Sequence, residues 1–103
     1  MSELRDKRVR FTLCLGILVN FIMSRGYECA IAPDGETHMT GSLHFVGLAK
    51  DFAIYKDGEY LKTTEDYEFA GKFWKSLSPD FRWGGDFMLP DGNHFSCTYQ
   101  GKA

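Results

Sequence analysis

The feature that most constrains the fold is a strand of alternating character that runs into an Asp-Gly turn. From Leu48 to Tyr55 successive residues fall on opposite sides, and Asp57-Gly58 follows shortly afterwards. One side carries Leu48, Lys50, Phe52 and Ile54, and the other carries Ala49, Asp51, Ala53 and Tyr55. Because an Asp-Gly pair between strand-like runs favours a two-residue hairpin turn, we expect this strand to pair with the next segment, Glu59 to Leu61. The sequence thus predicts an antiparallel sheet.

The amino-terminal segment predicts a long amphipathic helix from about Ser2 to Ser24, which Gly26 ends. One helical face carries Phe11, Leu15, Leu18 and Ile22. The basic residues before this apolar run resemble the start of a signal peptide, but two acidic residues dilute the charge and no good cleavage site follows. The run is also shorter and more interrupted than the roughly 20 apolar residues that cross a bilayer. We interpret it as a core helix, and expect no signal peptide and no stable membrane insertion.

The remaining elements complete a mixed fold. Thr63 or Thr64 is expected to cap a second helix that Pro79 ends, with aromatic residues at helical spacing facing the core. Short strands are predicted at residues 27–32, with Cys29 and Ile31 on one face, and at residues 94–99. The predicted fold class is therefore α+β: a small, mainly antiparallel sheet with two principal helices, in a single domain spanning residues 1–103.

Composition narrows the classes of function. The chain is 44% apolar and 16% aromatic, which predicts a folded protein with a core of its own. Its formal net charge of −2, without a basic stripe, argues against a nucleic-acid partner. The three cysteines are widely spaced and include no Cys-x-x-Cys pair, so the sequence encodes neither a disulfide framework nor a thiolate zinc finger.

Four residues in two segments carry the candidate chemistry. His44 and Asp51 begin and end one segment, and Asp91 and His94 lie on a predicted turn that leads into the last strand. Two imidazoles and one carboxylate can bind a divalent metal while leaving a position for water, and the second carboxylate can act as a base. The same residues also have structural explanations: Asp51 could form a salt bridge, and Asp91 could begin an ordinary Asp-Gly turn beside an incidental histidine. Asp86 competes for the role of base but has no neighbouring histidine.

Together, these segments resemble a known signature. The pattern Ser-x-His-x-x-Gly-x-Ala-x-Asp is formed here by Ser42, His44, Gly47, Ala49 and Asp51, and Asp-x-x-His is formed downstream by Asp91 and His94. With the intervening Trp83-Gly84-Gly85, this arrangement resembles the D-alanyl-D-alanine carboxypeptidase and L-alanyl-D-glutamate endopeptidase family. These are zinc peptidases of bacterial cell-wall peptides, and their fold is shared with the amino-terminal domain of Hedgehog proteins.

The resemblance implies a role for each matching residue. His44, Asp51 and His94 would bind Zn²⁺, and Asp91 would be the catalytic carboxylate. Ser42 would hydrogen-bond around the site. Trp83, beside two glycines, could either contact substrate as a wall of the cleft or belong to the core. The family usually has an arginine where this chain has Glu28, and Arg25, His38 and Arg82 are the candidate replacements.

The expected function is hydrolysis of peptidoglycan stem peptides at the L-alanyl-D-glutamate bond, as in phage endolysins. Such an enzyme would be made in the host cytoplasm, would act on the cell wall, and is expected to be a monomer. Three alternatives stay open at this point. One is a D-alanyl-D-alanine carboxypeptidase, another is an inactive module that binds zinc or peptidoglycan, and the third is a structural domain whose histidines are incidental.

Overall fold

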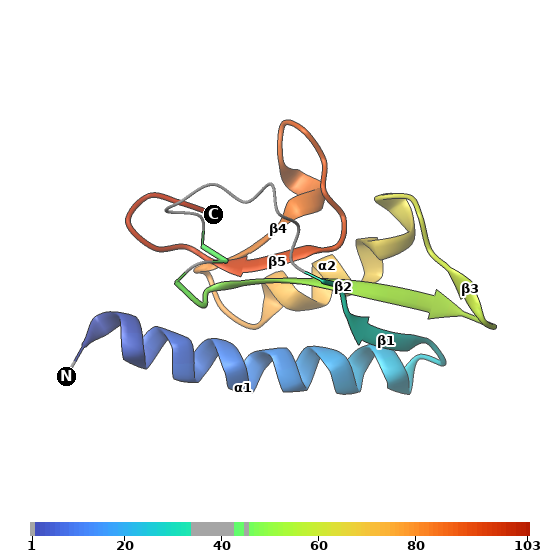
Figure 1. The fold of residues 1–103 in the computed structure, drawn as a ribbon, viewed down its shortest axis with the longest axis horizontal. Coiled ribbons are helices and arrows are strands. Elements are labelled where there is room, and N and C mark those ends of the chain that lie inside the picture. The colour runs from blue at the N-terminus through green and yellow to red at the C-terminus, as the bar shows by residue number, and fades with distance from the viewer. Residues whose placement is uncertain (1, 34–42, 45) are drawn as a thin grey trace.

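The computed structural model describes residues 2–33, 43–44 and 46–103. Two helices and a five-stranded antiparallel sheet form a mixed α+β fold, which confirms the predicted fold class (Figure 1). The helices are α1 (Glu3–Ser24) and α2 (Glu68–Ser76), and the 3-10 turns are η1 (Glu65–Tyr67) and η2 (Gly84–Asp86). The strands are β1 (Glu28–Ile31), β2 (Ala49–Lys56), β3 (Glu59–Tyr60), β4 (Phe81–Trp83) and β5 (His94–Cys97).

Strand β2 organises the sheet, whose order is β1-β2-β5-β4 with β3 also paired to β2. The backbone groups of the odd-numbered residues of β2 form hydrogen bonds along the edge that faces β1, as in the bond from the Ala32 amide to the Asp51 carbonyl. The backbone groups of the even-numbered residues of β2 form hydrogen bonds along the other edge, to β5 and to the β3 segment. Examples are the bond from the Phe52 amide to the Asn93 carbonyl and the bond from the Leu61 amide to the Ile54 carbonyl. Strands β5 and β3 therefore follow one another along the same edge of β2.

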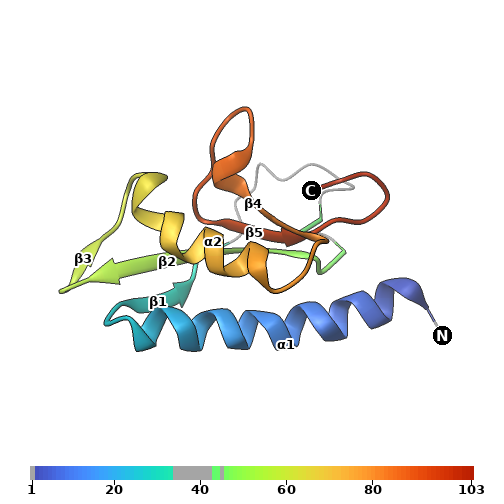
Figure 2. The same cartoon turned by 180° about the vertical axis from the view of Figure 1, so that it is seen from behind.

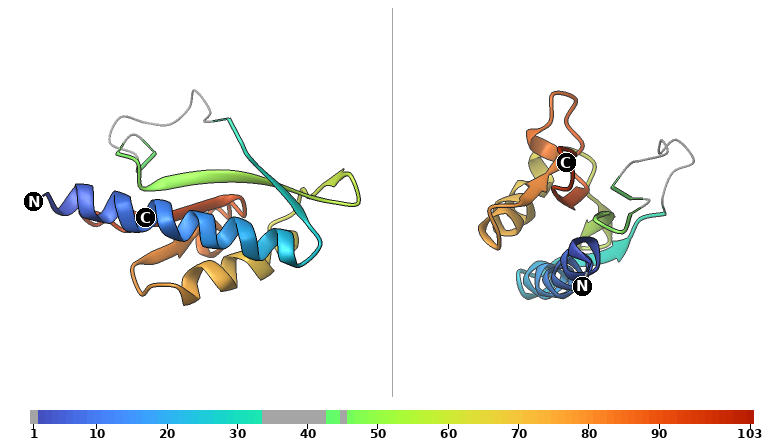
Figure 3. Two further views of the ribbon diagram at one scale, coloured as in Figure 1. Left: turned by 90° about the horizontal axis from the view of Figure 1, so that it is seen from below. Right: turned by 90° about the vertical axis from the view of Figure 1, so that its left-hand side faces the viewer.

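Both helices pack against one face of the sheet, where the core lies (Figures 2 and 3). The even-numbered residues Phe52 and Ile54 of β2 are buried there, as the alternation predicted. Trp74 of α2 stacks on Phe81 with ring centroids 4.0 Å apart and meets Phe11 of α1 edge-on at 5.6 Å. The opposite face of the sheet is therefore available to the candidate site.

Helix α1 confirms the predicted core helix, with one difference in its buried face. Phe11, Leu18 and Ile22 are buried as expected, but Cys14 is buried with them while Leu15 is only partly so. A free cysteine behaves as a small apolar residue, which accounts for its position in the core. Neither helix in the described part of the chain combines the length and the apolar character needed to cross a membrane.

The predicted hairpin and helix start are both present. Asp57 and Gly58 have φ angles of 52° and 80°, the left-handed geometry of a type I′ turn between β2 and β3. Thr63 and Asp66 form a reciprocal capping pair, in which each backbone amide donates to the other side chain at 3.4 and 3.2 Å. The helical segment then starts as η1 and continues as α2.

Two strand details differ from the sequence prediction. Strand β4 was not predicted, since three residues between Pro79 and two glycines offer too short a pattern to recognise. Strand β5 ends at Cys97, two residues earlier than expected, because the chain turns back after Tyr99. On the face of β1 that Cys29 and Ile31 share, Cys29 packs against the core while Ile31 is 64% exposed.

Candidate metal site

Three of the predicted site residues meet on the sheet face opposite the helices. The Oδ1 atom of Asp51 lies 3.6 Å from Nε2 of His44 and 3.6 Å from Nδ1 of His94. One donor atom from each of the three residues can be chosen so that all lie within 4.8 Å of one another. The side chains are only 5%, 14% and 10% exposed for His44, Asp51 and His94. The structure therefore forms a compact, nearly buried cluster from residues 50 positions apart.

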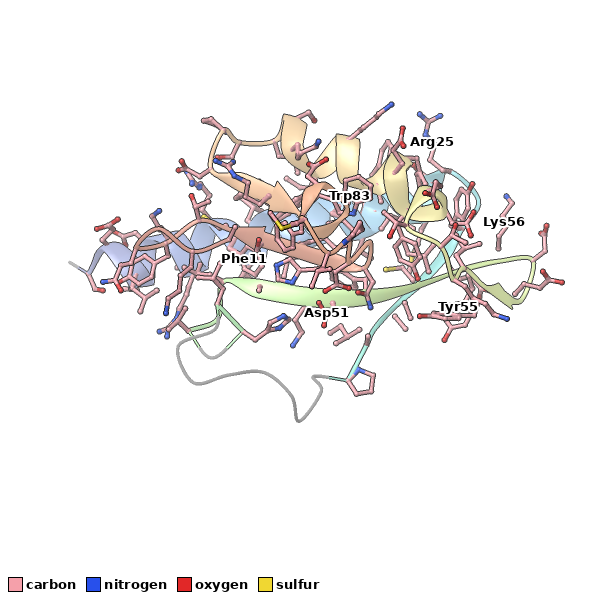
Figure 4. The ribbon with its side chains drawn as sticks, turned by 90° about the horizontal axis from the view of Figure 1, so that it is seen from above. Phe11, Arg25, Asp51, Tyr55, Lys56 and Trp83 are labelled. Carbon is pink, nitrogen blue, oxygen red and sulfur yellow. The ribbon has the colours of Figure 1, made fainter. Side chains whose placement is uncertain are left out.

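Sheet register brings Asp51 and His94 together. They are direct partners across β2 and β5. Because the neighbouring bond runs from the Phe52 amide to the Asn93 carbonyl, Asp51 and His94 occupy a non-hydrogen-bonded pair, in which opposing side chains come closest. Two of the three donors are thus fixed by regular secondary structure; in Figure 4, Asp51 can be located on β2.

A tight turn before β2 supplies the third donor. The Leu48 amide donates to the Leu43 carbonyl at 2.9 Å, and both of these leucines are buried. Gly47 has a φ of 76°, a conformation that side-chain-bearing residues rarely adopt. Arg8 of α1 donates through Nε to the Val46 carbonyl at 2.6 Å. These contacts hold the segment that carries His44 against the sheet.

The orientation of His94 is set by contacts on two sides of its ring. Its Nδ1 atom faces Asp51, while Nε2 lies 3.3 Å from the backbone oxygen of Ala103. With a proton on Nε2 donated to that carbonyl, Nδ1 keeps a lone pair directed toward the cluster. The chain reaches this point through a tight turn in which the amides and carbonyls of Tyr99 and Lys102 bond to each other. Phe87 covers the ring from another direction, with centroids 5.2 Å apart.

The chemistry of the donors fits a transition metal such as zinc. Tetrahedral ligands about 2.0–2.1 Å from Zn²⁺ lie roughly 3.3–3.4 Å from one another, close to the 3.6 Å separations here. Those separations are longer than the hydrogen bond that an imidazole N–H would make to a carboxylate, about 2.7–3.2 Å. Two neutral imidazoles and one carboxylate would leave a bound divalent ion one net positive charge and an open position.

Asp91 lies on the exposed turn just before β5. Its amide donates to the Gly84 carbonyl at 2.9 Å, and its own carbonyl accepts from the His94 amide at 3.1 Å. A pocket of about 260 Å³ opens beside this turn, and its lining includes Asp91, Asn93 and Lys62. Asp86, the competing carboxylate, is ion-paired with Lys75 at 2.7 Å. The arrangement thus places the exposed Asp91 three residues before His94 of the cluster.

The other residues singled out from the sequence have varied positions. Trp83 is only 5% exposed and donates through Nε1 to the Gly92 carbonyl at 2.7 Å, so it lies beneath the turn and does not line an open cleft. Arg25 stacks over Phe21, and Arg82 donates to the carbonyls of Pro79 and Phe81. Ser42 and His38 lie outside the described residues.

Two contributors to the site were missed by the sequence reasoning. The oxygen of Ala103 that contacts His94 is a backbone atom, and a sequence motif, which specifies side chains, cannot indicate it. Lys62 looked like one of many surface lysines, and only the pairing of β3 and β5 along one edge of β2 brings it to the pocket beside Asp91.

Comparison with known proteins agrees with this geometry. A family model described as D-alanyl-D-alanine carboxypeptidase matches residues 35–97, more than half of the chain. The matched range includes all three residues of the metal cluster and Asp91. A search of curated proteins found no significant match. On the strength of the family match, this chain belongs to the D-alanyl-D-alanine carboxypeptidase family of peptidases.

Proposed function

We propose that this protein is a zinc peptidase that hydrolyses peptidoglycan stem peptides. His44, Asp51 and His94 hold the ion in this proposal, and Asp91 is the catalytic carboxylate. The observation that carries it is the nearly buried cluster of two imidazoles and one carboxylate inside the region that matches the peptidase family, with each imidazole nitrogen 3.6 Å from the carboxylate oxygen and all three donors within 4.8 Å. Two histidines with an incidental role would not be expected to share a nearly buried cluster with a carboxylate inside the matched region.

The residues of the chain divide the work as follows. When bound, zinc lowers the pKa of a water molecule to about 7 and polarises the scissile carbonyl. Asp91 accepts a proton from the attacking water and passes it to the nitrogen of the leaving amine. The exposure of Asp91 suits this task, because a general base must reach both the water and the substrate. With the proton of His94 on Nε2 and donated to the backbone oxygen of Ala103, Nδ1 would be left to bind the ion.

For the scissile bond, we propose the L-alanyl-D-glutamate linkage and a role as a phage endolysin. The support is the resemblance described above: an aspartate at position 91, and the Trp83-Gly84-Gly85 segment. In this proposal the protein is a monomer made in the host cytoplasm that reaches the wall after the membrane opens. The first alternative is a D-alanyl-D-alanine carboxypeptidase. The second is an inactive binding module, favoured by Glu28 at the position where the family has arginine and by the engagement of Arg25 and Arg82 elsewhere.

The test combines elemental analysis with clearing of purified sacculi by the same preparation. We expect one zinc per chain and clearing that a chelator stops and added zinc restores. Asp91→Asn should keep the zinc but lose clearing, whereas Asp51→Ala should lose both. Asp86→Asn is the matched control, because it neutralises a nearby carboxylate that is already ion-paired and should remain active.

Each proposal has a result that would overturn it. If wild type clears sacculi no faster than the inactive Asp91→Asn variant, only the binding module is left, and a chain without zinc would remove the metal site altogether. If Asp91→Asn instead clears sacculi as fast as an active wild type, the role of Asp91 as the base is refuted. Mass spectrometry of the products then distinguishes the bonds. New amino-terminal D-glutamate supports the endopeptidase, and release of free D-alanine supports the carboxypeptidase.

A further inference from the structure

The indole of Trp83 makes a buried hydrogen bond to the turn that carries the proposed catalytic carboxylate. Its Nε1 donates to the carbonyl oxygen of Gly92 at 2.7 Å. Gly92 directly follows Asp91 and lies two residues before His94. With 5% of its surface exposed, Trp83 cannot present its ring to a substrate. Its contact with the site is therefore through the backbone of this turn.

Two glycines hold the indole in one position. A Cβ atom at Gly71 of α2 would lie 2.2 Å from Cδ2 of Trp83, and a Cβ at Gly85 would lie 2.2 Å from its Cη2. Real Cβ atoms do not approach this closely, so each glycine is needed for the ring to fit. The Lys75 ammonium lies 5.8 Å from the ring centroid and pairs with Asp86, next to Gly85. The close approach of both glycines thus leaves the indole no room to move away from the turn.

The same turn is held at two further points. The Gly84 carbonyl accepts a hydrogen bond from the Asp91 amide at 2.9 Å, and a Cβ at Gly84 would lie 2.0 Å from the backbone carbonyl oxygen of Asp91. On the opposite side, a Cβ at Gly92 would lie 2.8 Å from Cα of Thr64. The backbone beside Asp91 is therefore enclosed by β4, η2 and the start of the second helical segment.

We propose that Trp83 is a positioning residue: its N–H fixes the Gly92 carbonyl and thereby sets the placement of Asp91 relative to His94. This inference rests on the proposed function, in which Asp91 is the base. Displacing a catalytic base by about 1 Å lowers the rate on the order of 100-fold. Loss of this one hydrogen bond should therefore lower kcat by more than its effect on the free energy of unfolding would suggest.

Trp83→Phe tests the proposal, because it keeps an aromatic ring in the slot but removes the donor. We expect kcat on a soluble stem peptide to fall about 10-fold to 100-fold, with KM nearly unchanged and zinc still bound at one per chain. Trp74→Phe is the matched control. It makes the same chemical change at a second buried tryptophan, whose Nε1 donates to the carbonyls of Arg82 and Ser96. Under conditions where both variants are folded, Trp74→Phe should keep its kcat.

Amide hydrogen exchange in the metal-free protein provides a measurement that does not depend on activity. In Trp83→Phe, the amides of Asp91 and His94 should exchange faster than in wild type, at matched global stability. In Trp74→Phe their protection should follow global stability alone. This readout addresses the position of the turn directly.

The outcomes separate the two proposals. If Trp83→Phe keeps both its kcat and the protection of these amides, the positioning role is refuted while the peptidase assignment stands. Equal loss of kcat in both tryptophan variants would likewise refute it, since a general effect on folding would then explain the result. If wild type itself does not cleave stem peptides, the proposed function fails, and the exchange data still decide whether Trp83 holds the turn.

Discussion

Replacing Gly71 by alanine sets helix propensity against packing, and the structure decides which effect is larger. Gly71 lies inside α2, where alanine is intrinsically better than glycine by about 1 kcal/mol. However, its Cβ would lie 2.2, 2.5 and 2.6 Å from three atoms of the Trp83 indole. Gly85 closes the other side of the ring, so the indole cannot shift to make room.

Forcing an extra carbon into such a site typically costs about 1–3 kcal/mol, and the lack of room points to the upper end. Subtracting the gain in helix propensity leaves a net loss of about 2 kcal/mol. For a domain of about 100 residues, this corresponds to a decrease of roughly 10 °C in the thermal midpoint.

The assay is thermal and urea unfolding followed by circular dichroism, with Gly16→Ala as the control. Gly16 is also inside a helix, but its Cβ would meet nothing within 4 Å, so this change should stabilise the protein by about 1 kcal/mol. The two identical substitutions should therefore shift the midpoint in opposite directions. Equal stabilisation in both variants would refute the tight slot around Trp83.

Three further predictions concern the metal, alkaline pH and the carboxyl-terminal turn. Zinc at 100 times its dissociation constant should stabilise the fold by about 2.7 kcal/mol, seen as a rise in thermal midpoint that Asp51→Ala does not show. Burial raises the pKa of Cys29 to about 11 and that of Tyr67 to about 12, each above its ordinary value of 9.0 or 10.0. Since the fold favours the neutral forms, stability should hold below pH 9 and decline as the pH rises through 11 to 12, and a flat urea midpoint from pH 8 to 12 would contradict this. Deleting residues 100–103 removes the backbone oxygen that contacts Nε2 of His94, and zinc affinity measured in competition with a chelating dye should then fall about 10-fold to 100-fold. Lys102→Ala keeps the backbone and should leave the zinc affinity unchanged.

The parts of the fold that were predictable have strong local signals. The alternation along β2 and the Asp57-Gly58 turn follow from side-chain periodicity and from the left-handed backbone that glycine tolerates, and both are confirmed. Strand β4 was missed because its pairing with β5 is a long-range contact that leaves little trace in three residues. Cys29 and Ile31 were expected to share a face of their strand, but their different burial could not be predicted, because periodicity identifies a side of a strand and not whether other elements cover it.

For the site, the sequence identified the residue types and the structure supplied their arrangement. His44, Asp51 and His94 were expected to act together, and they meet within 4.8 Å. The spacing could not reveal that Trp83 would contact the turn from inside the core. That contact depends on how α2 packs against β4, which residue patterns do not specify.

The pairing of Asp51 with His94 makes the metal site sensitive to the register of the sheet. Because neighbouring side chains on a strand point to opposite faces, a slip of one residue between β2 and β5 would turn Asp51 away from the face that carries His94. The same slip would turn Phe52 and Ile54 out of the core, so a slipped sheet would lose apolar burial together with the donor set. Under the proposed zinc assignment, the zinc content of a preparation would report the fraction of chains whose strands have paired correctly, and zinc present during refolding should shift the population toward that register by mass action.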